Sequence, residues 1–277
     1  MKPLAGAIAG LLLVLCGSTG ANSAVVFCDA GPRDPAKTNV RSLETMTWSP
    51  LGRLETGWET YAPLIAQEIE TGCPATSAGF AAALAAWQSK HNRPATGVLD
   101  PATFTQMKLL WQSRRPFVAL SHIGCPSPPD EATLALAGPE ESYGGKPIML
   151  RPAALAAYRK MVAAARAELL AAATDRQLFA IFSGYRSPSY DAARCMREKN
   201  CQGVVRATCS AHRTGLAMDV YLGAAPGFGP DSSADANRLY LSRSQAYRWL
   251  VYNAWRFGFV NYVFEPWHWE WTGGPLH

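Results

Sequence analysis

Two short segments near the end of the chain hold side chains of the kinds that bind a catalytic metal ion. The first contains His212 and Asp219, and the second contains Glu265 and His268. Two imidazoles and one carboxylate are typical protein ligands of a catalytic zinc site, which also keeps one position open for water. We therefore predict that His212, Asp219 and His268 bind one Zn²⁺ ion. Glu265 is then the catalytic base that takes a proton from the attacking water.

The residues around these side chains suit a compact site. Gly215 and Ala217 are small, which lets the chain turn after the first histidine and enter a closely packed strand. Pro266 fixes the backbone between Glu265 and His268. A single histidine flanked by Trp267 and Trp269 would by itself indicate an ordinary packed side chain. The prediction depends on the two segments occurring together.

The full pattern, Ser-x-His-x-x-Gly-x-Ala-x-Asp followed by Glu-x-x-His, resembles the zinc D-alanyl-D-alanine carboxypeptidases of the VanY type. Every position of both motifs is matched, and the likeness covers about residues 140–273, including the segment Ser183–Ser187. The resemblance implies that Arg186 stabilises the oxyanion of the reaction and contacts the substrate. It also implies that Ser210 helps to hold the terminal carboxylate of the substrate, and we place Trp267 among the substrate contacts. A guanidinium suits this task because it is always charged and has a fixed planar shape.

This likeness predicts an enzyme, a zinc metallopeptidase that hydrolyses the terminal D-Ala-D-Ala amide of peptidoglycan stem peptides. Two alternatives remain open. One is a peptidoglycan endopeptidase of the same zinc family that cuts within the stem or the cross-bridge. The other is a non-catalytic, zinc-containing wall-binding protein, which the retained Glu265 disfavours. The stretch from Ser187 to Asp191 departs from the polar contact that the family often carries after its arginine, so the substrate contacts are less defined.

The N-terminus has the pattern of a secretory signal. Lys2 supplies a positive charge, residues 4–16 form an uncharged apolar run, and small residues suitable for cleavage follow before residue 24. The apolar run is too short for a membrane span. We therefore expect a signal peptide at 1–23 and an exported protein, periplasmic or secreted, that is associated with the cell wall.

The cysteine content agrees with export. Removal of the signal leaves an even number of cysteines, with no pair at the C-x-x-C spacing of a structural zinc site. They are Cys28, Cys73, Cys125, Cys195, Cys201 and Cys209. Three disulfides are expected. Proximity favours one bond inside the cluster of the last three cysteines, with the remaining member bonded to the N-terminal half, but the connectivity stays open.

Composition and charge limit the choice of partner. The chain is 48% hydrophobic and 17% charged, as in ordinary soluble proteins, and its formal net charge is +5. This mild basicity suits a polyanionic cell wall, with peptidoglycan as the partner, and is too weak and scattered to indicate nucleic acid. We expect a monomer.

The remaining sequence predicts two folded parts. An irregular segment at 24–57 precedes a helical domain at 58–115. This domain resembles the three-helix type of peptidoglycan-binding domain in Trp87, the turn from Gly97 to Asp100, and Trp111. A linker rich in proline and glycine at 116–150 leads to the zinc peptidase domain at 151–277.

Hydrophobic periodicity predicts the elements of both parts. Helices are expected at 59–70, 102–111 and 242–257, with another beginning at Pro152. Gly97 suits a turn with positive φ, Pro101 suits the first position of a helix, and Asp100 and Ser242 are expected as N-caps. Strands are expected at 178–182, 218–222, 259–264 and 267–271. The fold class is therefore α+β, with a small antiparallel sheet and flanking helices carrying the zinc site, preceded by a small three-helix domain.

Overall fold

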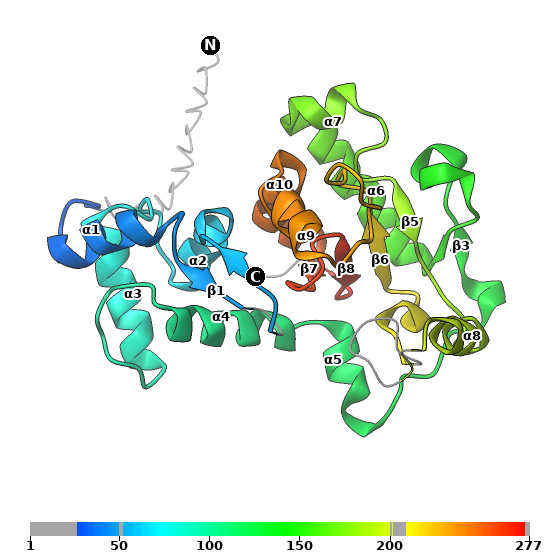
Figure 1. The fold of residues 1–277 in the computed structure, drawn as a ribbon, viewed down its shortest axis with the longest axis horizontal. Helices are drawn as coiled ribbons and strands as arrows, with labels where there is room; N and C mark the ends of the chain where they lie inside the picture. Colours follow the sequence, from blue (N-terminus) through cyan, green and yellow to red (C-terminus); the bar gives the residue numbers. More distant parts are fainter. Residues whose placement is uncertain (1–26, 50–51, 200, 202–208, 275–277) are drawn as a thin grey trace, which may run out of the picture.

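The computed structural model of this chain describes residues 27–49, 52–199, 201 and 209–274. The expected signal peptide at 1–23 lies outside the described residues. Elements α1–α4 lie at one end of the molecule and a four-stranded sheet with its helices at the other, with α4 and α5 leading from one to the other (Figure 1). Among the described residues, no helix combines the length and the apolar character needed to cross a membrane.

The N-terminal part consists of four α-helices and a two-stranded antiparallel ribbon. Its elements are α1 (Arg33–Ser42), β1 (Thr47–Trp48), β2 (Glu55–Thr56), α2 (Ala62–Glu68), α3 (Ala78–Lys90) and α4 (Pro101–Ser113). The helix expected at 59–70 is a short 3₁₀ turn, η2 (Glu59–Tyr61), followed by α2. The segment expected to be irregular, 24–57, instead contains α1 and both strands of the ribbon.

Local side-chain chemistry explains the start of α4. Asp100 is the N-cap, and its carboxylate accepts a hydrogen bond of 2.6 Å from the backbone amide of Thr103. Pro101 occupies the first turn, where its missing amide hydrogen costs nothing. Gly97 has φ +67°, and a Cβ there would lie 2.6 Å from the carbonyl oxygen of Ala81, so only glycine fits. These three residues behave as their sequence pattern predicts.

Helix α1 belongs to this part because of long-range hydrogen bonds that local periodicity does not reveal. Buried Asn39 donates to the carbonyl oxygen of Gly97 at 2.9 Å and accepts from the amide of Leu99 at 2.9 Å. The side chain thereby replaces backbone partners that the turn between α3 and α4 lacks. The helical part begins well before residue 58, where the sequence placed its boundary.

The C-terminal part is a four-stranded antiparallel sheet with helices packed around it. Its strands follow the order β5-β6-β8-β7, so sequence neighbours β6 and β7 are separated by β8. The elements are α6 (Pro152–Glu168), α7 (Leu170–Thr174), β5 (Ile181–Ser183), α8 (Pro188–Glu198), β6 (Ala217–Val220), α9 (Asp235–Ser242), α10 (Gln245–Asn253), β7 (Phe259–Asn261) and β8 (His268–Trp271). The α+β prediction is confirmed.

Several element boundaries differ from the expected ones. The strand expected at 178–182 begins only at Ile181, because Phe179 has a left-handed backbone with φ +70°. The helix expected at 242–257 is divided. Ser242 ends α9, Ser244 caps α10 by accepting from the amide of Tyr247, and the 3₁₀ helix η8 (Ala254–Phe257) follows. Ser242 as N-cap is therefore wrong.

The segment expected to be a linker, 116–150, has structure of its own. It contains α5 (Pro116–Leu120) and an antiparallel pair of short strands, β3 (Ala135–Leu136) and β4 (Met149–Leu150). A disulfide joins Cys125 in this segment to Cys209. The other disulfides are Cys28–Cys73 and Cys195–Cys201. This connectivity has one bond inside the C-terminal cysteine cluster and one from that cluster to the N-terminal half, as sequence proximity favoured.

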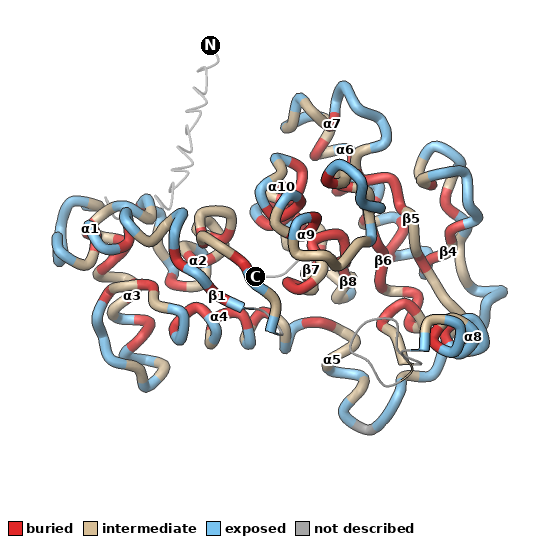
Figure 2. Tube along the Cα trace, viewed as in Figure 1, coloured by how far each residue is buried: buried red, intermediate tan, exposed pale blue. Residues whose placement is uncertain are grey.

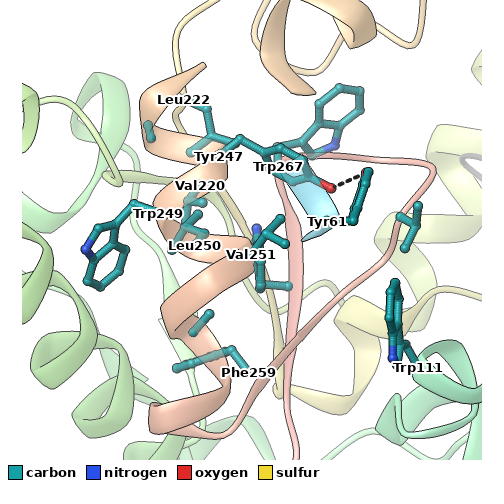
Figure 3. Close-up of a cluster of buried hydrophobic side chains, with 14 of the residues drawn as sticks. Tyr61, Trp111, Val220, Leu222, Tyr247, Trp249, Leu250, Val251, Phe259 and Trp267 are labelled. Carbon is teal, nitrogen blue, oxygen red and sulfur yellow. Dashed lines mark hydrogen bonds between the residues drawn. The ribbon is translucent and has the colours of Figure 1, made fainter. Parts of the chain in front are cut away.

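One hydrophobic core extends through both parts of the molecule. Buried positions follow α3 and α4 on one side and β5, β6 and β8 on the other (Figure 2). Tyr61 from the N-terminal part shares a hydrogen bond of 2.9 Å with Tyr247 of α10, and both hydroxyls are buried (Figure 3). Gln112 of α4 donates to the carbonyl oxygen of Asn261 in β7. The N-terminal part is thus packed directly against the sheet that carries the predicted site.

Candidate metal centre

The three predicted metal ligands come together in the structure. One ligand atom from each of His212, Asp219 and His268 lies within 4.8 Å of the other two, and all three residues are buried. Asp219 in β6 is the direct cross-strand partner of His268 in β8, so the sheet register sets this pair. His212 lies on the 3₁₀ helix η7 (Ala211–Thr214), which leads into β6.

One hydrogen bond fixes the orientation of the His212 ring. Its Nδ1 atom lies 2.7 Å from the carbonyl oxygen of Gly184, which can only accept, so Nδ1 carries the proton. The unprotonated Nε2 atom then faces Asp219, 3.2 Å from Oδ2. Burial lowers the pKa of His212 to about 4, and the positive charge of Arg186 adds to this effect. His212 is therefore neutral at physiological pH, as a metal ligand must be.

His268 is held differently, by carboxylates on both sides of its ring. Its Nδ1 atom lies 2.9 Å from Oδ1 of Asp219, and its Nε2 atom lies 3.3 Å from Oε1 of Glu270. Burial opposes a charge on the ring, but the hydrogen bonds to Asp219 and Glu270 outweigh it and raise the pKa of His268 to about 9. Without a metal ion, this ring carries a proton that metal binding must displace.

Asp219 links the two histidines. Burial alone would raise the pKa of its carboxyl group, but the interactions with the His212 and His268 rings hold the pKa well below its usual range. The group is a carboxylate at any physiological pH. The site therefore offers one anionic oxygen and two ring nitrogens, and contacts with Gly184 and Glu270 orient the two rings. This donor set fits a Zn²⁺ ion.

Glu265 lies beside this ligand set, at the turn between β7 and β8. Its Oε2 atom is 4.0 Å from Nδ1 of His268, and its side chain is 14% exposed. The turn is closed by hydrogen bonds from the Glu265 amide to the carbonyl of Tyr262 and from the His268 amide to the carbonyl of Glu265. Burial raises the pKa of Glu265, and the nearby charge of Asp219 adds to this effect. A carboxyl group in this setting is suited to exchanging protons with a reacting molecule.

Arg186 is fixed at the edge of the same site by contacts along its guanidinium. It donates to Oδ1 of Asp191 at 3.0 Å, to Oγ of Ser183 at 3.0 Å and to Oγ of Ser210 at 2.7 Å. Asp191 is 1% exposed, so the ion pair is screened little by solvent. Ser210 also accepts from the amide of His212, which couples the arginine to the ligand loop.

A cleft of about 490 Å³ is lined by the three candidate ligands together with Glu265, Arg186 and Ser210. Trp267 forms part of its wall, although only 3% of the residue is exposed. Charged side chains at the cleft include Lys146, Arg194 and Asp231. The cleft thus places a metal-ligating set, a carboxyl group of raised pKa and a fixed guanidinium around one space. That combination is suited to hydrolysis of a polar substrate.

Three residues that position the site were missed in the sequence. Asp191 was noted only as part of a divergent stretch, although it is five positions after Arg186 and at the start of α8. Glu270 is two positions after His268 in the same strand, so both side chains lie on one face of the sheet. This spacing could have identified Glu270 as a neighbour of the His268 ring. Arg115 pairs with Glu270 across a sequence separation of 155 residues, and no local pattern indicates this contact.

One family model matches the part of the chain that carries the candidate site. Residues 148–274 match the model of the family described as VanY, D-alanyl-D-alanine carboxypeptidase. No curated protein matches the chain significantly. A solved structure of the LdcB LD-carboxypeptidase is similar at 23% identity and a TM-score of 0.37, over 53% of this chain and 70% of that one.

A second solved structure is a mutant of the vancomycin-resistance D,D-pentapeptidase VanY from a VanB-type cassette, in complex with Zn(II). It is 19% identical, with a TM-score of 0.31, over 53% of this chain and 83% of that one. The family match covers all three converging ligands, Glu265 and Arg186. The part of this chain that carries the candidate site, residues 148–274, thus matches the VanY family of D-alanyl-D-alanine carboxypeptidases.

Proposed function

We propose that this protein is a zinc-dependent D,D-carboxypeptidase that removes the terminal D-alanine from peptidoglycan stem peptides. The observation that carries the proposal is the convergence of His212, Asp219 and His268 within 4.8 Å, with Glu265 beside them in an open cleft. A purely structural zinc site is closed by protein ligands, whereas a catalytic one keeps a position accessible. The family match over residues 148–274 points to the same reaction.

His212, through Nε2, and His268, through Nδ1, would hold the metal ion together with the Asp219 carboxylate. When bound, zinc supplies Lewis acidity that polarises the carbonyl group of the bond to be cleaved. Burial keeps His212 neutral, the Gly184 carbonyl fixes its tautomer, and Glu270 orients His268. These contacts orient both rings before a metal arrives.

Glu265 acts as the proton carrier of the reaction. As a carboxylate it accepts a proton from the attacking water, and as a carboxylic acid it returns this proton to the departing amine of D-alanine. Its raised pKa brings the two forms closer in free energy at neutral pH, which favours both halves of this exchange.

Arg186 binds negative charge in the cleft, either on the oxyanion or on the terminal carboxylate of the substrate. Its contacts with Ser183, Asp191 and Ser210 hold the guanidinium in place before the substrate binds, so little reorganisation is needed. The Ser210 hydroxyl accepts from Arg186 and from the His212 amide, which leaves its own proton available for a substrate carboxylate. Trp267 contributes a rigid apolar wall to the cleft.

The substrate is expected outside the cytoplasm. Three disulfides in the described residues support export, because such bonds persist in oxidising compartments. We propose that the N-terminal helical part, which carries the motif from Trp87 to Trp111, binds peptidoglycan. By holding the enzyme near the wall, it would raise the local concentration of stem peptides. Sedimentation of the intact protein with purified wall sacculi tests this module, and the zinc-free protein should sediment to the same extent if binding is independent of the catalytic site.

Digestion of purified muropeptides followed by mass spectrometry tests which bond is cleaved. The expected result is loss of one D-alanine from pentapeptide stems, with cross-linked dimers otherwise intact. Conversion of dimers to monomers would instead indicate an endopeptidase. Binding to the wall without any product would indicate a non-catalytic protein.

A further inference from the structure

A buried chain of contacts connects the metal ligand His268 with a residue from the N-terminal half. Nε2 of His268 lies 3.3 Å from Oε1 of Glu270, and the same oxygen accepts from Nε of Arg115 at 2.7 Å. The second oxygen of Glu270 accepts from the backbone amide of Phe117 at 2.8 Å. Arg115 and Phe117 lie at the start of α5, before the region that matches the family model.

Burial makes each member of this chain dependent on the next. Glu270 is 1% exposed and Arg115 is 7% exposed. Arg115 and the Phe117 amide hold the two oxygens of Glu270, and a buried carboxylate without a compensating cation is costly. Loss of the guanidinium would therefore displace the carboxylate, which would no longer be a fixed acceptor for the His268 ring.

The acceptor determines which ring nitrogen of His268 can bind a metal. Glu270 accepts from Nε2, which keeps the proton on that atom and leaves Nδ1 directed at Asp219 and the cleft. Rotation of the ring or a change of tautomer would turn a protonated nitrogen toward the metal position. Contacts of this kind commonly tune the affinity of metal sites.

Arg115 has a further contact with the same turn. Its guanidinium lies over the ring of Tyr262, 4.1 Å from the centroid, and Tyr262 in turn packs edge-on against His268. The carbonyl of Tyr262 accepts from the amide of Glu265. Arg115 therefore contacts both Glu270, which holds the His268 ring, and Tyr262, whose carbonyl holds the Glu265 amide.

We propose that Arg115 and Glu270 form a positioning pair that sets the tautomer and orientation of His268. The segment that begins α5 would then be a part of the metal centre, although it precedes the family-matched region. This inference rests on the proposed metal-binding role of His268. A structural ion pair that only docks α5 is the competing explanation, and it predicts reduced stability with unchanged metal affinity.

Zinc affinity of the full mature chain, measured by competition with a chromophoric chelator, separates these explanations. The variants are Arg115→Met, which removes the charge but keeps an apolar stem, and Glu270→Gln, which keeps the shape and an acceptor oxygen. Arg114→Met is the matched control, because Arg114 pairs with Glu68 and is half exposed. Thermal unfolding of each protein without zinc provides the separate measure of stability.

We expect Arg115→Met to weaken zinc binding by about 10- to 100-fold, the usual effect of losing such a supporting contact, and Arg114→Met to leave it within about twofold. Glu270→Gln should give a smaller loss, because its amide oxygen can still accept from His268. Cobalt-substituted Arg115→Met should also show a shifted visible spectrum, because ligand geometry sets those bands.

Wild-type zinc affinity in Arg115→Met and Glu270→Gln, with only the unfolding temperature lowered, would overturn the proposal. If Arg115→Met does not fold, Arg115→Lys decides in its place. This variant keeps the charge but lacks the fork of donors, and it should still bind zinc more weakly than the wild type. A wild-type protein that binds no zinc would overturn this inference and the proposed function together. One that binds zinc but releases no D-alanine would overturn the proposed function alone.

Discussion

The two histidines of the metal centre are held in opposite ways. His212 is positioned by a neutral backbone carbonyl, and its pKa is lowered to about 4. His268 is positioned by carboxylates, and its pKa is raised to about 9. The first arrangement lies wholly within the family-matched region, whereas the second depends on Arg115 outside it. In the proposed metal site, one ring is ready to bind metal, while the other must first lose a proton.

Removal of either ring should have the largest effect. We expect His212→Ala and His268→Ala each to abolish stoichiometric zinc binding, because a site with only two protein ligands is incomplete. Metal analysis of the purified variants after dialysis checks this result. A full equivalent of zinc in either variant would show that the replaced histidine is not required as a ligand.

Glu265 lies on the His268 side of the site but is not expected to bind metal. Glu265→Gln should retain one equivalent of zinc and lower kcat by about 10²- to 10⁴-fold, the usual contribution of a general base. Steady-state release of D-alanine and metal analysis on the same sample measure both properties. Loss of zinc in this variant would indicate that Glu265 is a ligand rather than a proton carrier.

The disulfide Cys125–Cys209 anchors the His212 side, since Cys209 directly precedes Ser210 and the ligand loop. Replacement of both cysteines by serine should lower the free energy of unfolding by about 2–4 kcal/mol. Denaturant titration measures this loss. The Cys28–Cys73 disulfide is a matched control far from the site, and its removal should leave zinc affinity unchanged.

The pH dependence of zinc affinity should reflect the different charges of the His212 and His268 rings. Between about pH 6 and 8, His212 is already neutral, whereas His268 carries the proton that binding displaces. Zinc affinity should therefore rise about tenfold per pH unit in this range, with about one proton released per ion. Calorimetric titration in buffers of different ionisation enthalpy counts the protons. Release of two protons or of none would contradict the assigned states of the rings.

The sequence predicted which side chains converge at the candidate metal centre because the residue types and spacing of each motif are local. His212 and Asp219 share one segment, and Glu265 and His268 share another, so their residue types and spacing were readable together. The N-cap at Asp100 and the turn at Gly97 were predicted for the same reason. The resemblance to the VanY family is confirmed by the match over residues 148–274.

Contacts between distant segments could not be read in this way. Asn39 attaches α1 to the turn at Gly97, and Arg115 reaches Glu270, yet neither pair has a recognisable spacing. Ser242 and Ser244 are equally good caps by residue type. The structure selects Ser244 because the Ser242 hydroxyl donates instead to the buried Glu55. Tertiary hydrogen bonds therefore decided the positions where local preference was ambiguous.

Release of D-alanine from a stem pentapeptide, followed by mass spectrometry, tests the central claim most directly. The wild-type protein should yield the tetrapeptide and free D-alanine when loaded with zinc, and it should lose this activity in a chelator and regain it when zinc is restored. Glu265→Gln loaded with zinc should leave the pentapeptide intact over the same period. Undiminished tetrapeptide formation after zinc removal, or by Glu265→Gln, would contradict the proposed mechanism.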